Sequence, residues 1–177
     1  GLNHTALAQQ TLAEWNFPNS PDNSLVDIAV PMNAAATIAT QGGTGAALFT
    51  NAGATTRSAH ATNWDNGNGL KYWEITIATT GYSDIWISSK QRSSPAGPRD
   101  FKMQYRIGAG VWNDVPGATA ILLADNWTSG IVNATLLPAA CDNQFSVSIR
   151  WIMTSNTSVS AGVVGAAGVS NIDDINI

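Results

Sequence analysis

The chain carries little charge. Only 11% of its 177 residues are Asp, Glu, Lys or Arg, which is about half the usual share for a globular protein. Eight basic residues against twelve acidic ones give a net charge of -4, and the sequence contains no basic run. Nucleic acid and anionic membranes attract proteins through clustered Lys and Arg, so this composition argues against both as partners.

Cysteine and long apolar runs are also scarce. The single cysteine, Cys141, excludes an intrachain disulfide, so a secreted form would depend on its core, or on a bound metal, for stability. No apolar run approaches the roughly 20 residues that a membrane-spanning helix needs. With 177 residues, the chain is long enough for one domain with a full hydrophobic core.

Signs of catalysis are missing as well. The two histidines, His4 and His60, lie in no triad-like arrangement with Ser, Cys or Asp, and we expect both on the surface or in loops. Glu14 and Glu74 are the only glutamates, and most aspartates occupy turn-like positions rather than paired ones. The sequence therefore predicts a protein that is not an enzyme.

What the sequence does contain is a two-residue alternation of apolar and polar side chains. It is clearest in residues 70–115, as three runs separated by turn residues, with a tight reversal expected at Thr80-Gly81. β-branched and aromatic residues at every second position indicate strands with one buried face. The side chains expected in the core are Trp73, Ile75, Ile77, Ile85, Ile87, Phe101, Met103, Tyr105, Phe145, Val147, Ile149 and Trp151.

The same pattern predicts short strands along the rest of the chain. These are expected in residues 11–17, 25–30, 46–50, 57–62, 120–123, 131–137, 144–154 and 171–177. No segment shows a helical period with caps. Roughly ten strands at turn-marked spacing predict an all-β fold, an antiparallel β-sandwich of jelly-roll type. We assign residues 11–177 to this single domain and residues 1–10 to an N-terminal arm.

The chain has seven tryptophans, and their positions point to core residues and to candidate binding residues. Trp15, Trp73 and Trp151 share strand faces with aliphatic residues, which predicts core positions, whereas Trp86 faces away from its aliphatic neighbours. The remaining tryptophans lie in turn-like segments beside amide and carboxylate groups, a combination that suits a sugar or a protein partner. The alternative is a tryptophan lid over the end of the sandwich. The candidate residues are Trp64, Asp65, Asn66, Trp112, Asn113, Asp114, Asp125, Asn126 and Trp127.

The adjacent carboxylates Asp173 and Asp174 are the sharpest polar feature. Neighbouring residues in a strand point to opposite faces, so one of the two must lie on the core side or at its edge, where a carboxylate needs a partner. Glu14 and Asp27 could join them in an all-oxygen calcium site. The alternative is a solvated strand end, or an ion pair with a basic residue, for which the candidates are Arg99 and Arg150.

These segments resemble a known group of modules. Residues 70–115 combine an aromatic strand, the turn Thr79-Thr80-Gly81-Tyr82, a strand ending in Gln91-Arg92-Ser93, and the motif Gly97-Pro98-Arg99-x-Phe101-x-x-x-Tyr105. With Glu14-Trp15-Asn16-Phe17 and Ile172-Asp173-Asp174-Ile175 at the two ends, the chain is similar to the jelly-roll modules of bacterial extracellular and cell-surface proteins. Glycan-binding members are appended to secreted hydrolases and nucleases. The resemblance implies a β-sandwich, an extracellular location and a calcium ion shared by the first and last strands.

Two functions compete at this stage. The main hypothesis is a secreted, non-catalytic protein that assembles with copies of itself into a filament, sheath or surface layer. An arm containing Thr5, Leu7, Thr11 and Leu12 would add to the edge of a neighbouring subunit, because so few charges protect the edge strands. The alternative is a carbohydrate-binding module that uses exposed tryptophans. A start at Gly1 without a leader fits a mature chain at the cell surface or outside it.

Overall fold

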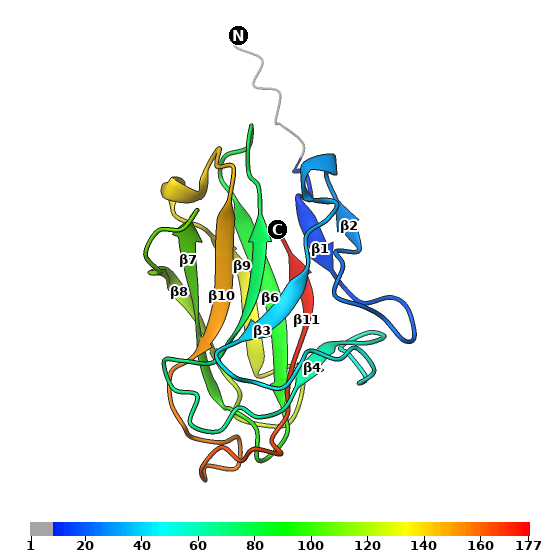
Figure 1. Ribbon diagram of the computed structural model, residues 1–177, viewed down its shortest axis with the longest axis vertical. Coiled ribbons are helices and arrows are strands. Elements are labelled where there is room, and N and C mark those ends of the chain that lie inside the picture. The colour runs from blue at the N-terminus through cyan, green and yellow to red at the C-terminus, as the bar shows by residue number, and fades with distance from the viewer. Residues whose placement is uncertain (1–8) are drawn as a thin grey trace.

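Residues 9–177 are described by the computed structural model, and they form two packed antiparallel sheets (Figure 1). Two short 3-10 helices, η1 (Pro31–Asn33) and η2 (Ala139–Cys141), accompany the strands, and no helix in this part of the chain is long and apolar enough to cross a membrane. The strands are β1 (Ala13–Trp15), β2 (Ile28–Ala29), β3 (Ile38–Gln41), β4 (Ala59–Ala61), β5 (Tyr72–Ile77), β6 (Trp86–Ser93), β7 (Asp100–Ile107), β8 (Asn113–Ile121), β9 (Gly130–Leu136), β10 (Val147–Met153) and β11 (Ser170–Asn176). The predicted sandwich is therefore confirmed.

From β2 to β7, and again from β8 to β11, successive strands alternate between the two sheets, whereas β1 pairs with β2 and β7 with β8 inside one sheet. One sheet has the order β2-β1-β11-β6-β9, with β4 also paired to β11, and the other has the order β3-β5-β10-β7-β8. In Figure 1, β7 and β10 of the five-stranded sheet lie in front of β6 and β9 of the six-stranded sheet. The reversal at Thr80-Gly81 therefore joins strands of different sheets, β5 and β6, instead of closing a hairpin.

The core lies between the sheets and contains most of the side chains that alternation predicts. Trp73 and Trp151 are almost completely buried, and each indole N–H donates a hydrogen bond to a serine of the six-stranded sheet. Trp73 Nε1 donates to Ser170 Oγ at 3.1 Å, and Trp151 Nε1 donates to Ser89 Oγ at 3.0 Å. These bonds satisfy the polar edge of each ring, so both rings fill the core without an orphaned donor.

Four expectations about individual segments were wrong. Phe145 is 90% exposed because it precedes the first paired residue of β10, Val147, and so lies beyond the end of the sandwich. Tyr105 is only partly buried. His60 is buried rather than on the surface, since β4 lies along β11 and the imidazole Nε2 hydrogen-bonds Thr50 Oγ1. Residues 46–50 form a single bridge instead of a strand.

Candidate functional site

The outer face of the five-stranded sheet carries a continuous polar row. The register pairs Arg150 of β10 with Glu74 of β5 on one side and with Gln104 of β7 on the other. Gln104 in turn pairs with Asp114 of β8. Residues paired directly across a sheet project from the same face, so these four side chains form one line across four strands.

Hydrogen bonds link three members of this row, Arg150, Gln104 and Asp114. Arg150 donates from Nε and Nη2 to Gln104 Oε1 at 2.9 and 2.6 Å, and Gln104 Nε2 donates to Asp114 Oδ1 at 2.6 Å. Lys102 Nζ lies 2.9 Å from the same Asp114 oxygen. Hydrogen bonds from Lys102 and Gln104 lower the pKa of Asp114, so its carboxylate stays charged and acts as an acceptor.

Two aromatic rings lie beside the row. Tyr72 and Trp112, both half-buried, meet edge to face with ring centroids 6.0 Å apart. The Arg150 guanidinium lies 4.7 Å from the Tyr72 ring and 4.2 Å from the Trp112 ring, and the Arg106 guanidinium lies 4.5 Å from the latter. Stacked guanidinium groups fix the rings in place, which makes this a rigid aromatic surface.

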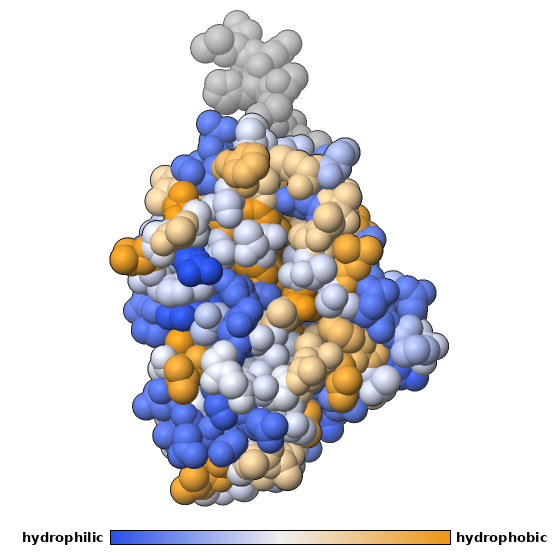
Figure 2. Space-filling view, viewed as in Figure 1, coloured by the Kyte–Doolittle hydropathy of each residue, from blue (hydrophilic) through white to orange (hydrophobic). Residues whose placement is uncertain are grey.

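A shallow hollow of about 470 Å³ continues the face toward β3. Its polar lining comes from Thr37, Gln41, Glu74, Thr76 and Arg106. Arg106 Nη2 donates to Glu74 Oε1 at 3.2 Å. Figure 2 views the molecule from this side, and hydrophilic side chains run across the left and middle of the face, over β7 and β10. Flat rings beside fixed donors and acceptors suit a ligand with an apolar face and a hydroxyl rim.

Only part of the predicted site lies here. Trp112 and Asp114 belong to this face, whereas the neighbouring Asn113 is exposed and donates to the Val111 carbonyl. Sequence reasoning missed Tyr72, Gln104, Arg106 and Arg150, although the alternation placed them on the polar sides of their strands.

The prediction that Trp64 is exposed was wrong. Its ring is fully buried, 5.7 Å from the Trp73 ring and 5.9 Å from the Phe101 ring. The buried Lys71 ammonium donates to the carbonyls of Asn63 and Asp65 at 2.7 and 2.6 Å. These bonds pull the loop onto the end of the sandwich, so Trp64 closes the core, as a lid would. Neither Asp65, which lies 3.6 Å from the Lys71 ammonium, nor the exposed Asn66 belongs to the polar row.

The third predicted tryptophan lies in the loop between β8 and β9. Trp127 is half-buried, and its buried Nε1 has no hydrogen-bond partner within residues 9–177. Asp125 forms an ion pair with Arg92 of β6 at 2.6 Å, and Asn126 Oδ1 accepts backbone N–H bonds from its own turn. This loop is a separate polar cluster, attached to the six-stranded sheet.

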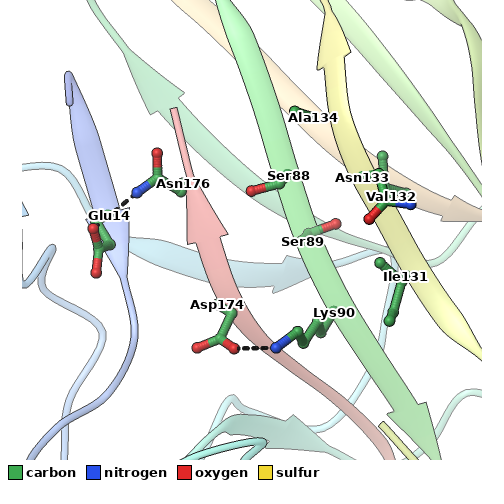
Figure 3. Close-up of a pocket in the computed structure, with 10 residues that line it drawn as sticks. All are labelled: Glu14, Ser88, Ser89, Lys90, Ile131, Val132, Asn133, Ala134, Asp174 and Asn176. Atoms are coloured by element: carbon green, nitrogen blue, oxygen red, sulfur yellow. Dashed lines mark hydrogen bonds and ion pairs between the residues drawn. The ribbon is translucent and has the colours of Figure 1, made fainter. Parts of the chain in front are cut away.

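The predicted metal ligands lie on or beside the six-stranded sheet. Figure 3 shows a hollow, of about 450 Å³, in which Glu14 accepts a hydrogen bond from Asn176 at 2.8 Å and Asp174 pairs with Lys90 at 2.8 Å. Neither Arg99 nor Arg150 is the partner of Asp174. Two irregularities in strand register flank this part of β6.

The other two candidate ligands are held by backbone donors. Asp27 Oδ2 accepts from the N–H groups of Asn16 and Phe17, each at 2.9 Å. Asp173 is completely buried and accepts from the N–H groups of Asp174 and Ala54, each at 2.7 Å. Burial raises its pKa to about 7.

As they lie, these carboxylates do not form a calcium site. Within the described residues, no group of three or more Asp, Glu, His or Cys side chains is arranged to hold a metal ion. An ion at Asp173 would have to compete with the backbone N–H groups that already bond both of its carboxylate oxygens. The predicted calcium site therefore stays a hypothesis.

Comparisons with known proteins bear on the fold. No family model and no curated protein matches the chain. Solved structures do: a xylan-binding domain of carbohydrate-binding module family 22 aligns with 96% of this chain and 95% of its own at 13% identity, with a TM-score of 0.52. The C-terminal family 22 module of Clostridium thermocellum Xyn10B aligns with 97% of this chain and 95% of its own, with the same identity and score.

A third match is a structure described as a carbohydrate-binding module from the β-sandwich superfamily. It is 14% identical, with a TM-score of 0.51, and the alignment covers 95% of this chain and 62% of the other. At these identities the likeness shows the fold alone. The resemblance noted from the sequence, to jelly-roll modules of extracellular proteins, is confirmed at that level.

Proposed function

We propose that this protein is a non-catalytic module that binds a polysaccharide on the outer face of its five-stranded sheet. The fold is shared with structures described as carbohydrate-binding modules. The observation that carries the proposal is the rigid aromatic surface of Tyr72 and Trp112 beside the bonded pair of Gln104 and Asp114 and beside Glu74, which Arg106 holds.

The geometry assigns a role to each group. A pyranose ring has a flat C–H face, which packs against an aromatic ring, and a rim of hydroxyls that need donors and acceptors. Trp112 and Tyr72 offer the apolar surface, while Glu74 and Asp114 offer acceptors. Because the row and the hollow cross several strands, a ligand could extend over more than one sugar unit.

Trp112→Ala should lower the affinity for the bound polysaccharide by about tenfold or more, because a centrally placed aromatic contact commonly contributes over 1 kcal/mol. Affinity electrophoresis against soluble glucans, xylans, mannans and polyuronates identifies the ligand, and calorimetry then measures the loss. Trp127→Ala is the matched control, since it removes a half-buried loop tryptophan away from the face. Equal losses in both variants, or no loss in Trp112→Ala, would refute the assignment.

Self-association is the second candidate. Thr5 and Leu7 of the predicted arm lie outside the described residues, but Gln9, Gln10, Trp86 and Ile177 line a hollow of about 450 Å³ at the start of the domain. Trp86 is 44% exposed there, and such apolar surface can bind another chain.

The next two residues of the arm have places in their own domain. Leu12 is buried in its own core, with its N–H bonded to the Ile177 carbonyl, and Thr11 is half-buried, so Leu12 is not free to fill a neighbour's groove. Sedimentation velocity over a wide concentration range decides the question: concentration-dependent growth supports assembly, and a constant monomer contradicts it.

A further inference from the structure

Resting on the proposed function, we propose that the polysaccharide is acidic, and that its carboxylate or sulfate ester binds the guanidinium pair of Arg106 and Arg150. The charges and the unused donors on this face determine which glycan it selects.

The face is positive although the chain is negative. Lys102, Arg106 and Arg150 project from it together with two carboxylates, Glu74 and Asp114, and a third carboxylate on the same side of β7, Asp100, is neutralised by its neighbour Arg99 at 2.9 Å. This leaves an excess of one positive charge, while the whole chain has a net charge of -4. A local excess of positive charge attracts negatively charged ligands. A neutral glycan would gain nothing from this excess.

Two of the three cations already have carboxylate partners. Lys102 pairs with Asp114 at 2.9 Å and Arg106 pairs with Glu74 at 3.2 Å. Arg150 has no carboxylate within 4.0 Å in the described part of the chain, and its two hydrogen bonds converge on one amide oxygen, Gln104 Oε1. This half-buried cation therefore has no carboxylate in direct contact, although Glu74 lies opposite it in the sheet.

The guanidinium groups also hold donors that no residue uses. Arg106 Nε is buried and has no acceptor among residues 9–177, and Arg150 makes no hydrogen bond through Nη1 in that part of the chain. Both groups lie over the same Trp112 ring, so their charges repel each other at short range. Burial and, to a smaller extent, the nearby Arg106 lower the pKa of Arg150, and Tyr72 and Glu74 offset only part of this effect.

An anionic group on the ligand would supply a negative charge beside Arg150 and acceptors for the unused donors. The planar fork of a guanidinium matches the paired oxygens of a carboxylate or a sulfate ester and forms short, charge-assisted hydrogen bonds with them. Because Trp112 lies against both arginines, a sugar ring could stack on the exposed part of the indole while its acidic substituent reaches the pair. Neighbouring polar groups, Gln41 and Thr76, remain for uncharged hydroxyls along the hollow.

The test compares acidic polysaccharides with uncharged counterparts of the same backbone. Calorimetric titrations use polygalacturonate, alginate and glucuronoxylan, each against its carboxyl-reduced form, and dextran sulfate against dextran. We expect at least one acidic polymer to bind ten times more tightly or better than its neutral partner, with a preference that shrinks as salt increases. Binding of the carboxyl-bearing polymers identifies a uronic acid, and binding of dextran sulfate alone identifies a sulfate ester.

Variants assign the preference to the arginines. Arg150→Gln and Arg106→Gln should each remove most of the acidic preference, and Arg150→Lys should restore it only partly, because the ammonium lacks the fork. Arg92→Gln, which removes one charge from the six-stranded sheet, should change nothing. Equal affinity for acidic and neutral polymers would overturn this inference and leave the proposed function standing. Binding to none of the polymers would contradict both.

Discussion

Trp151→Ala should cost about 3–5 kcal/mol in the free energy of unfolding, through lost burial and the cavity left behind. Trp151 lies in β10, the central strand of the five-stranded sheet, where it pairs with Trp73 and Met103 and is 1% exposed. Its loss would also orphan the buried Ser89 hydroxyl, which bonds the indole N–H at 3.0 Å. Urea denaturation followed by circular dichroism measures the change.

The matched control for this prediction is Trp86→Ala. Trp86 is 44% exposed on the other sheet, so its removal should cost no more than about 1 kcal/mol. If Trp151→Ala does not fold, Trp151→Phe gives the same comparison with a smaller cavity. A loss in Trp151→Ala no greater than that in Trp86→Ala would contradict the packing described for the core.

In the presence of a chelator, the ionisation of Asp173 should lower the stability of the protein as the pH rises from about 4 to 7, which opposes the gain from the buried His60, whose pKa is lowered. The cause is Asp173, whose burial raises its pKa from 3.8 to about 7 in the folded state. Between these values the folded chain holds a proton that the unfolded chain has lost, so stability falls with increasing pH and levels off above 7. At about 1.4 kcal/mol for each pH unit, the loss is on the order of 4 kcal/mol.

Thermal melts at closely spaced pH values measure this effect. Asp173→Asn should abolish the fall, whatever its absolute stability, and Asp125→Asn should retain it, because Asp125 is an ion-paired loop residue. The same melts test the calcium hypothesis. If the ion binds the ionised carboxylate, calcium at pH 7 should restore stability in the wild type and not in Asp173→Asn. Identical pH profiles for wild type and Asp173→Asn would remove Asp173 as the cause.

The sequence was sufficient for the fold because alternation is a local signal. Residues two apart in a strand face the same side, so the runs around Ile75, Met103 and Ile149 reveal their buried faces without any knowledge of their partners. Phe145 obeys the same alternation but lies past the end of the paired region. The point at which a strand is no longer covered by the facing sheet depends on the length of that sheet. The alternation within one strand carries no information about it.

The site was harder to predict because it depends on register. Glu74, Arg150, Gln104 and Asp114 come from four strands, and only cross-strand pairing aligns them. In a linear reading each is one polar residue among many on the outer side of a strand.

The residues next to the tryptophans in the sequence were a poor guide to which of them are exposed. Trp64 and Trp112 both lie among Asn and Asp, yet Lys71 draws the loop of one into the core, while two arginines hold the other on the surface. The contacts that distinguish them join residues far apart in the chain.

The most direct test of the central claim is a chemical-shift titration of the isotope-labelled protein with an oligosaccharide of the polysaccharide it binds. We predict that the largest shifts fall on the outer face of the five-stranded sheet, at the Trp112 indole N–H, Tyr72, Gln104 and the Arg150 guanidinium, with little change at the Trp127 indole. Shifts confined to the Trp127 loop, or to the hollow around Lys90 on the opposite sheet, would show that the polysaccharide binds elsewhere and would contradict the account.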